Sequence, residues 1–162
     1  MEKNTYYYKE LFANLQQNRN NGPAPHKPVL LLSIITLYGI GVYTDNRIYL
    51  NSQLEEEFVK LWNRLVTSEF HNCKLATPFY HMGGEPFWKL VPKEGCEERI
   101  KNPGDMYTLS HLKESIYWAT IDQELANIMI DSPKRTIMAN FILEKYFPET
   151  KDYYPYTYNY NA

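Results

Sequence analysis

The sequence has little of what metal and redox sites require. It contains two cysteines, Cys73 and Cys96, and four histidines. A zinc site needs closely spaced ligands, such as Cys-x-x-Cys or two histidines on adjacent turns of a helix, and neither pattern occurs. The group His71-Asn72-Cys73 has no second cluster to complete a coordination sphere. We therefore predict that the protein uses no metal and no other cofactor.

Sequence patterns of catalysis are also missing. There is no Gly-x-Ser-x-Gly elbow, no P-loop and no dinucleotide-binding glycine pattern. The acidic run Glu55–Glu57 is typical of a solvated first helical turn, where negative charge suits the helix dipole. A small hydrolase is the weakest interpretation because no nucleophile and base can be named. We expect no enzymatic activity from these residues.

Long apolar runs are absent too. The most apolar segment is interrupted by Ser33, Thr36, Gly39 and Gly41, and it falls short of the ~18–20 residues that span a bilayer. The N-terminal stretch MEKNTYYYKE contains no apolar region typical of a signal peptide. Because nothing else points to export, the sequence predicts a cytoplasmic protein without membrane contact.

What is present is the composition of one globular domain. The chain has 162 residues, of which 44% are hydrophobic and 22% charged, and this length allows a self-sufficient core. The net charge is −2, so any binding to nucleic acid must come from a local cationic patch. Fifteen tyrosines are the unusual feature, since tyrosine suits recognition surfaces as well as cores.

Hydrophobic periodicity predicts mostly helices. They are expected over 5–18, from about Pro28 to Gly39 or Gly41, from Ser52 to about residue 65, and over 110–118, 119–132 and 133–147. Residues 45–51 indicate a short strand, and 74–91, with a Gly83-Gly84 turn, a β-hairpin. The sequence thus predicts an α+β fold, a mainly helical single domain with a β-hairpin and a winged-helix-like outline. We place the domain at residues 1–148 and assign 149–162 to a tyrosine-rich tail or linker.

A candidate anion site lies at the start of the most apolar helix. His26 and Lys27 immediately precede Pro28, and a helix N-terminus offers unpaired N–H groups to a phosphate. Flanking prolines would fix the direction of both side chains. The alternative is a histidine packed on its neighbours and a solvated lysine. Lys74 and Arg19 are weaker candidates for contacts with a nucleic-acid backbone.

The segment LATPFYHMGGEPFW supplies a second candidate element, because proline and aromatic rings can form a shallow apolar pocket. Its candidate binding residues are Thr77, Pro78, Tyr80 and His81. The alternative is that the aromatic side chains of this segment face the core. We favour that alternative for Phe87 and Trp88.

Three segments, in this order, resemble one known family. They are APHKPVLLL (24–32), TPF…GGEPFWKL (77–90) and ATIDQELANIMIDSPKRTIMANFILEKYF (119–147). Together they are similar to the sulfur-binding domain of McrA-type, modification-dependent HNH restriction endonucleases, from about residue 8 to residue 148. The resemblance implies a module that binds phosphorothioate-modified duplex DNA, in which sulfur replaces a non-bridging phosphate oxygen. It further implies DNA contacts by His26 and Lys27 and a small apolar sulfur cavity around Pro78.

The chain departs from the family pattern at three places. Thr77 stands where an aromatic residue often precedes the cavity proline, His81 replaces a small apolar residue, and the upstream arginines are reduced to Arg19. These changes make the cavity more polar or less cationic, so another modification or plain duplex DNA stay open as ligands. No HNH segment is present in the sequence, so two alternatives stay open: a binding module with a linked or partner HNH nuclease domain, or a free-standing reader. The alternative function is a non-catalytic protein-interaction domain that uses a tyrosine-rich surface.

Overall fold

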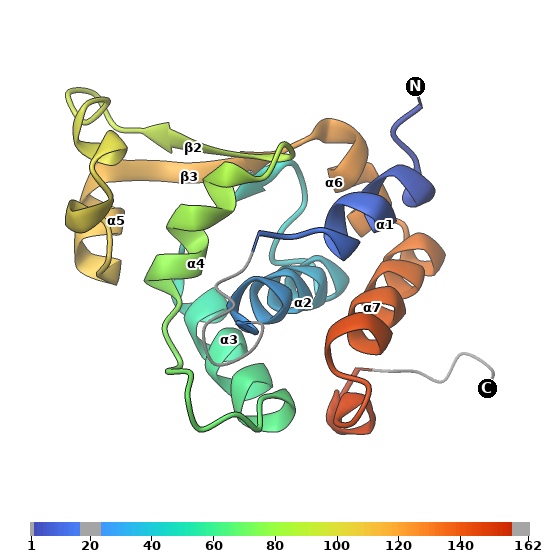
Figure 1. Cartoon of the computed structure of the whole chain (residues 1–162). Coiled ribbons are helices and arrows are strands. Elements are labelled where there is room, and N and C mark those ends of the chain that lie inside the picture. Colours follow the sequence, from blue (N-terminus) through green and yellow to red (C-terminus); the bar gives the residue numbers. More distant parts are fainter. Residues whose placement is uncertain (1, 17–23, 157–162) are drawn as a thin grey trace.

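The computed structural model describes residues 2–16 and 24–156. Within these ranges the chain forms seven α-helices and one three-stranded antiparallel sheet (Figure 1). The helices are α1 (Thr5–Ala13), α2 (His26–Gly39), α3 (Ser52–Leu65), α4 (Ala76–His81), α5 (Leu109–Ser115), α6 (Gln123–Ile130) and α7 (Ser132–Tyr146). The strands are β1 (Arg47–Ile48), β2 (Trp88–Pro92) and β3 (Ile116–Ile121). The α+β, mainly helical single domain expected from the sequence is confirmed, and the winged-helix likeness stays a prediction.

Helix α2 is the centre of the fold. All its side chains from Lys27 to Tyr38 are buried, and α3, α4, α6 and α7 lie around it (Figure 1). The sequence predicted this apolar helix with an end near Gly39 or Gly41, and the helix ends at Gly39. The helix begins at His26 and includes Pro28 in its first turn, where the missing N–H is not needed. In the part of the chain that the structure describes, no helix is both long and apolar enough to cross a membrane.

The β-hairpin predicted over 74–91 is wrong. Residues 76–81 form helix α4, a 3₁₀ turn follows at Met82–Gly84, and only β2 is a strand. Pro78 fits a helix because it lies in the first turn, where no N–H donor is required. The two glycines make the turn that leads the chain from α4 towards β2, so they do not join two strands.

Strand β3 is the second correction. The sequence suggested helices over 110–118 and 119–132, whereas α5 ends at Ser115, β3 occupies Ile116–Ile121 and α6 begins at Gln123. The run IYWATI is rich in aromatic and β-branched residues, which favour strands, but it is too short for periodicity to decide. β3 is the central strand, in the order β1-β3-β2, and pairs antiparallel with both neighbours.

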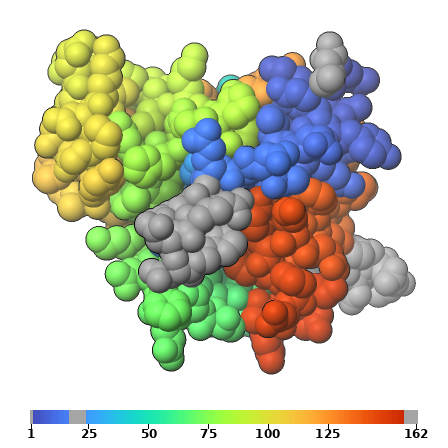
Figure 2. All heavy atoms as spheres, viewed as in Figure 1, coloured from blue at the N-terminus to red at the C-terminus, as the bar shows by residue number. Residues whose placement is uncertain are grey.

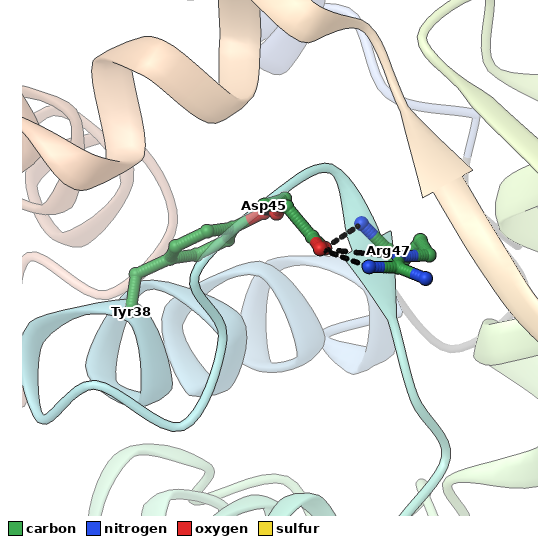
Figure 3. Close-up of polar contacts among 3 residues, drawn as sticks. All are labelled: Tyr38, Asp45 and Arg47. Carbon is green, nitrogen blue, oxygen red and sulfur yellow. Dashed lines mark hydrogen bonds and ion pairs between the residues drawn. The ribbon is translucent and has the colours of Figure 1, made fainter.

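The turn between α2 and β1 is fixed by Asp45 (Figure 3). Its carboxylate accepts hydrogen bonds from the backbone N–H and the guanidinium of Arg47, and its carbonyl oxygen accepts a hydrogen bond from the hydroxyl of Tyr38. The hydrogen bonds from Arg47 lower the pKa of Asp45 below its ordinary value. These contacts join the end of α2 to β1, one of the two edge strands of the sheet.

Segments distant in the sequence form one continuous surface. Helix α1, blue in Figure 2, lies against α7, orange-red in the same view. Near the C-terminus, Thr150 donates to the carbonyl oxygen of Leu65 at 2.8 Å, and the side chain of Tyr154 is buried. Residues 150–156 therefore lie on the body of the domain. The domain boundary after residue 148, with a tail or linker beyond it, stays a prediction.

Candidate functional site

One cavity of about 920 Å³ opens between the start of α2, helix α4 and the edge strand β2. Seven residues singled out from the sequence line it: His26, Lys27, Lys74, Thr77, Pro78, Tyr80 and His81. The eighth, Arg19, lies outside the described residues. The fold therefore brings together the two candidate elements that are far apart in the sequence. Contacts of these residues with a ligand stay a prediction.

His26 forms part of the cavity wall and is held by its neighbours. Its Nε2–H donates to the carbonyl oxygen of Asn72 at 2.7 Å, and its ring lies against Trp62 with 4.7 Å between the ring centroids. Burial lowers the pKa of His26 below its ordinary value, so the ring is neutral at pH 7. In this tautomer Nδ1 is an acceptor. His26 thus matches the alternative of a histidine packed on its neighbours. Its ring would carry a positive charge only if Nδ1 were protonated as well.

Lys27 is buried rather than solvated. Its residue is 7% exposed and that of Glu85 is 5% exposed, and the Lys27 Nζ lies 2.7 Å from the Glu85 Oε2. The same oxygen accepts the backbone N–H of Gln16 at 2.9 Å. Lys27 borders the cavity, whereas Glu85 lies behind it. An ammonium has three N–H donors, so the ion pair leaves Lys27 with donors for other partners.

Glu85 was missed from the sequence. It follows the turn Met82–Gly84 and precedes the buried pair Phe87-Trp88. A carboxylate placed among buried aromatic residues needs a charged or hydrogen-bonded partner. The position of Glu85 in an aromatic segment could therefore have indicated a buried ion pair. The identity of that partner could not be read from the sequence, because Lys27 comes from a different helix.

The inner wall of the cavity is largely apolar. Pro78 and Trp88 are buried, and Phe87 is also buried, as the core alternative predicted for Phe87 and Trp88. The hydroxyl of Tyr80 donates to the carbonyl oxygen of Ile100 at 2.6 Å, and burial raises the pKa of Tyr80. The Trp88 Nε1–H has no acceptor within residues 2–16 and 24–156. The wall is therefore mainly hydrophobic, and the unpaired indole nitrogen of Trp88 is itself buried.

The mouth of the cavity carries the exposed cations. Lys74, Lys89 and Lys101 all border it and are exposed. Lys101 forms an ion pair with Glu98 at 3.1 Å, whereas Lys74 and Lys89 have no ion pair among the residues that the structure places. Lys89 was not singled out from the sequence, since the hairpin interpretation gave no reason to place it near Lys74.

His81 also lies at the mouth. Its Nε2 is 3.3 Å from the hydroxyl oxygen of Tyr107, a residue that the sequence assigned only to a surface loop. Burial and, to a smaller extent, the positive charge of Lys27 lower the pKa of His81 below its ordinary value. At neutral pH His81 is therefore a neutral polar group beside the apolar wall.

Charge is divided between the interior and the mouth of the site. Among the described residues, no group of three His, Cys, Asp or Glu side chains is placed to hold a metal ion. The charges inside the cavity are balanced by the Lys27–Glu85 pair, and the unpaired lysines lie at the mouth. Such an arrangement fits a ligand with an anionic backbone outside and a weakly hydrated group inside, because burying a strongly hydrated group costs more free energy.

The family model of the ScoMcrA-like, DNA sulfur-binding domain matches residues 8–153 of the chain. The matched range contains all the described residues that line the cavity. No curated protein matches the chain.

Proposed function

The chain belongs to the ScoMcrA-like DNA sulfur-binding domain family, and on that premise we propose that its cavity reads phosphorothioate-modified or otherwise modified duplex DNA. The module supplies recognition in a modification-dependent, type IV-like restriction system and has no catalysis of its own. Cleavage of the bound DNA falls to a nuclease of the HNH class, either linked to this chain or associated with it.

The observation that carries this proposal is the grouping of the predicted residues around one cavity. The DNA backbone crosses the mouth, where Lys74 and Lys89 contact phosphates and supply most of the affinity through counterion release. The modified group enters the cavity and contacts the ring of Pro78. Sulfur is larger and more weakly hydrated than oxygen, so an apolar wall favours it. Thr77 and His81 flank the entrance and set how polar a group is accepted.

The tyrosine surplus supports the core as well as the surface. Tyr8, Tyr38, Tyr43 and Tyr154 are buried. The hydroxyl of Tyr8 donates to Asp122 and that of Tyr43 to the carbonyl oxygen of Tyr49, both at 2.7 Å. These four of the fifteen tyrosines have a role inside the domain, which reduces the surplus that a protein-interaction surface would have to explain. This observation favours the DNA-binding proposal over a protein-interaction domain.

Binding to two matched duplexes tests the proposal. One duplex carries a single phosphorothioate linkage and the other is identical but unmodified, and each is titrated at two salt concentrations. We expect tighter binding to the modified duplex, and affinity for both that falls as salt rises. Absence of binding to either duplex would overturn the proposal. Equal binding to both would keep DNA as the ligand and remove sulfur as the feature that is read.

Lys74→Ala tests the cationic mouth. Because Lys74 is exposed and has no ion pair among the described residues, its loss is expected to weaken binding to both duplexes equally and to reduce the salt slope by about 1. Lys134→Ala is the matched control, since Lys134 is exposed on α7 and does not border the cavity. A Lys74→Ala protein that binds like the Lys134→Ala protein would remove Lys74 from the interface.

A further inference from the structure

The Lys27–Glu85 ion pair sets the charge of the cavity interior. Both residues are more than nine-tenths buried, and Lys27 borders the cavity whereas Glu85 does not. Besides this pair, the ionisable groups bordering the cavity are the exposed lysines of the mouth, Tyr80, and His26, His71 and His81. Burial lowers the pKa of His26 and His81, so both are neutral at pH 7. Without Glu85 the interior would carry one uncompensated positive charge.

We propose that Glu85 is a specificity-determining residue, which acts through Lys27 by neutralising it and so prevents the cavity from capturing an unmodified phosphate. This inference rests on the proposed function, because it concerns how the same cavity separates modified from unmodified DNA. Glu85 is a positioning residue in this role, since it lies behind Lys27 and does not border the cavity itself.

The physical basis is the difference in hydration between oxygen and sulfur. A phosphate oxygen that enters a neutral, apolar cavity loses strongly bound water and gains little in return. A free ammonium would compensate for that loss with a charge-assisted hydrogen bond, which is stronger to oxygen than to sulfur, a weak acceptor. Glu85 already accepts a hydrogen bond from Lys27 at 2.7 Å, so this compensation is reduced. Selectivity thus comes from weakening the wrong ligand rather than from strengthening the right one.

The cations at the mouth do not account for selectivity. Lys74 and Lys89 attract every DNA backbone, modified or not, and cannot discriminate between the two. Discrimination has to come from inside the cavity, where the apolar wall of Pro78 and Trp88 meets the neutralised lysine. The separation of an attractive mouth from a neutral interior assigns affinity and selectivity to different residues.

Glu85→Gln tests this assignment because the amide oxygen still accepts from the Gln16 N–H and from Lys27 while the charge is removed. We expect affinity for the unmodified duplex to rise about tenfold and that for the phosphorothioate duplex by about two- to threefold, so the ratio between them falls. The salt slope for the unmodified duplex rises by about 1. Thermal unfolding monitored by circular dichroism confirms that the variant is folded before binding is measured.

Two further variants separate the inference from its alternatives. Glu98→Gln is the matched control, because Glu98 pairs with the cavity-lining Lys101 but is exposed, and it should leave the ratio unchanged within about twofold. Lys27→Met/Glu85→Gln removes both charges and should restore the ratio towards that of the parent. Equal gains for both duplexes, or a double variant that keeps the low ratio, would overturn the role of Glu85. A parent protein that binds neither duplex would instead overturn the proposed function.

Discussion

Lys27→Ala is expected to lower the free energy of unfolding by about 3–5 kcal/mol, because it strands a buried carboxylate. Glu85 is 5% exposed and lies behind the cavity rather than on it. Without Lys27, the Glu85 carboxylate keeps the hydrogen bond from the backbone N–H of Gln16. Glu85→Gln should cost less, since the amide oxygen still accepts from Lys27 and the Lys27 side chain borders the open cavity. Urea unfolding of both variants measures the two values.

The control for this prediction is Lys74→Ala, which removes an exposed lysine from the same cavity. Its free energy of unfolding should stay within about 0.5 kcal/mol of the parent value. Lys27→Met/Glu85→Gln should recover most of the stability lost by Lys27→Ala, because it leaves no buried charge and keeps an acceptor for the Gln16 N–H. If Lys27→Ala kept the stability of the parent and lost affinity for both duplexes, Lys27 would be a direct phosphate ligand and the ion pair a minor contact.

The consequence for recognition is that affinity at this site is not a count of basic residues. Of the four lysines bordering the cavity, Lys27 and Lys101 are paired with carboxylates. One pair is buried and the other exposed, so only the first changes the environment of a group inside the cavity. A sequence-based interpretation that treats His26 and Lys27 as equal cations therefore overstates the positive charge of the interior.

The sequence was most informative where one segment determined its own structure. Helix α2 was predicted because its residues are apolar on nearly every face, and its end at Gly39 follows from local chain chemistry. The residues near Pro78, which the sequence grouped with His26 and Lys27, border the same cavity as that pair, and their role as one binding site stays a prediction. Here the resemblance to a family supplied what periodicity could not.

The errors arose where tertiary partners decide the outcome. The segment 76–92 contains enough apolar and aromatic residues for a hairpin, yet β2 pairs with β3, which comes from a segment assigned to a helix. The Lys27–Glu85 pair likewise joins α2 to the turn after α4. Neither partner is close in the sequence, so local propensity carries no information about the pairing.

The C-terminal segment raises the same question for the domain boundary, which the sequence placed after residue 148. Tyr154 is 3% exposed whereas its neighbour Tyr153 is 63% exposed. The Tyr154 hydroxyl is 3.2 Å from the Thr36 Oγ1 on the central helix. A segment that buries a tyrosine against α2 contributes to the stability of the domain, while a linker does not.

Tyr154→Ala is therefore expected to lower the free energy of unfolding by about 3–5 kcal/mol, the usual cost of removing a buried aromatic side chain. Tyr153→Ala is the matched control and should change it by less than about 0.5 kcal/mol, because that side chain is exposed. Urea unfolding of the two variants gives the comparison directly. Equal, small effects would mean that residues 149–156 behave as a linker and that the domain ends at residue 148. A large effect confined to Tyr154 would instead extend the domain to this tyrosine, so that any partner domain joined at the C-terminus would be linked beyond it.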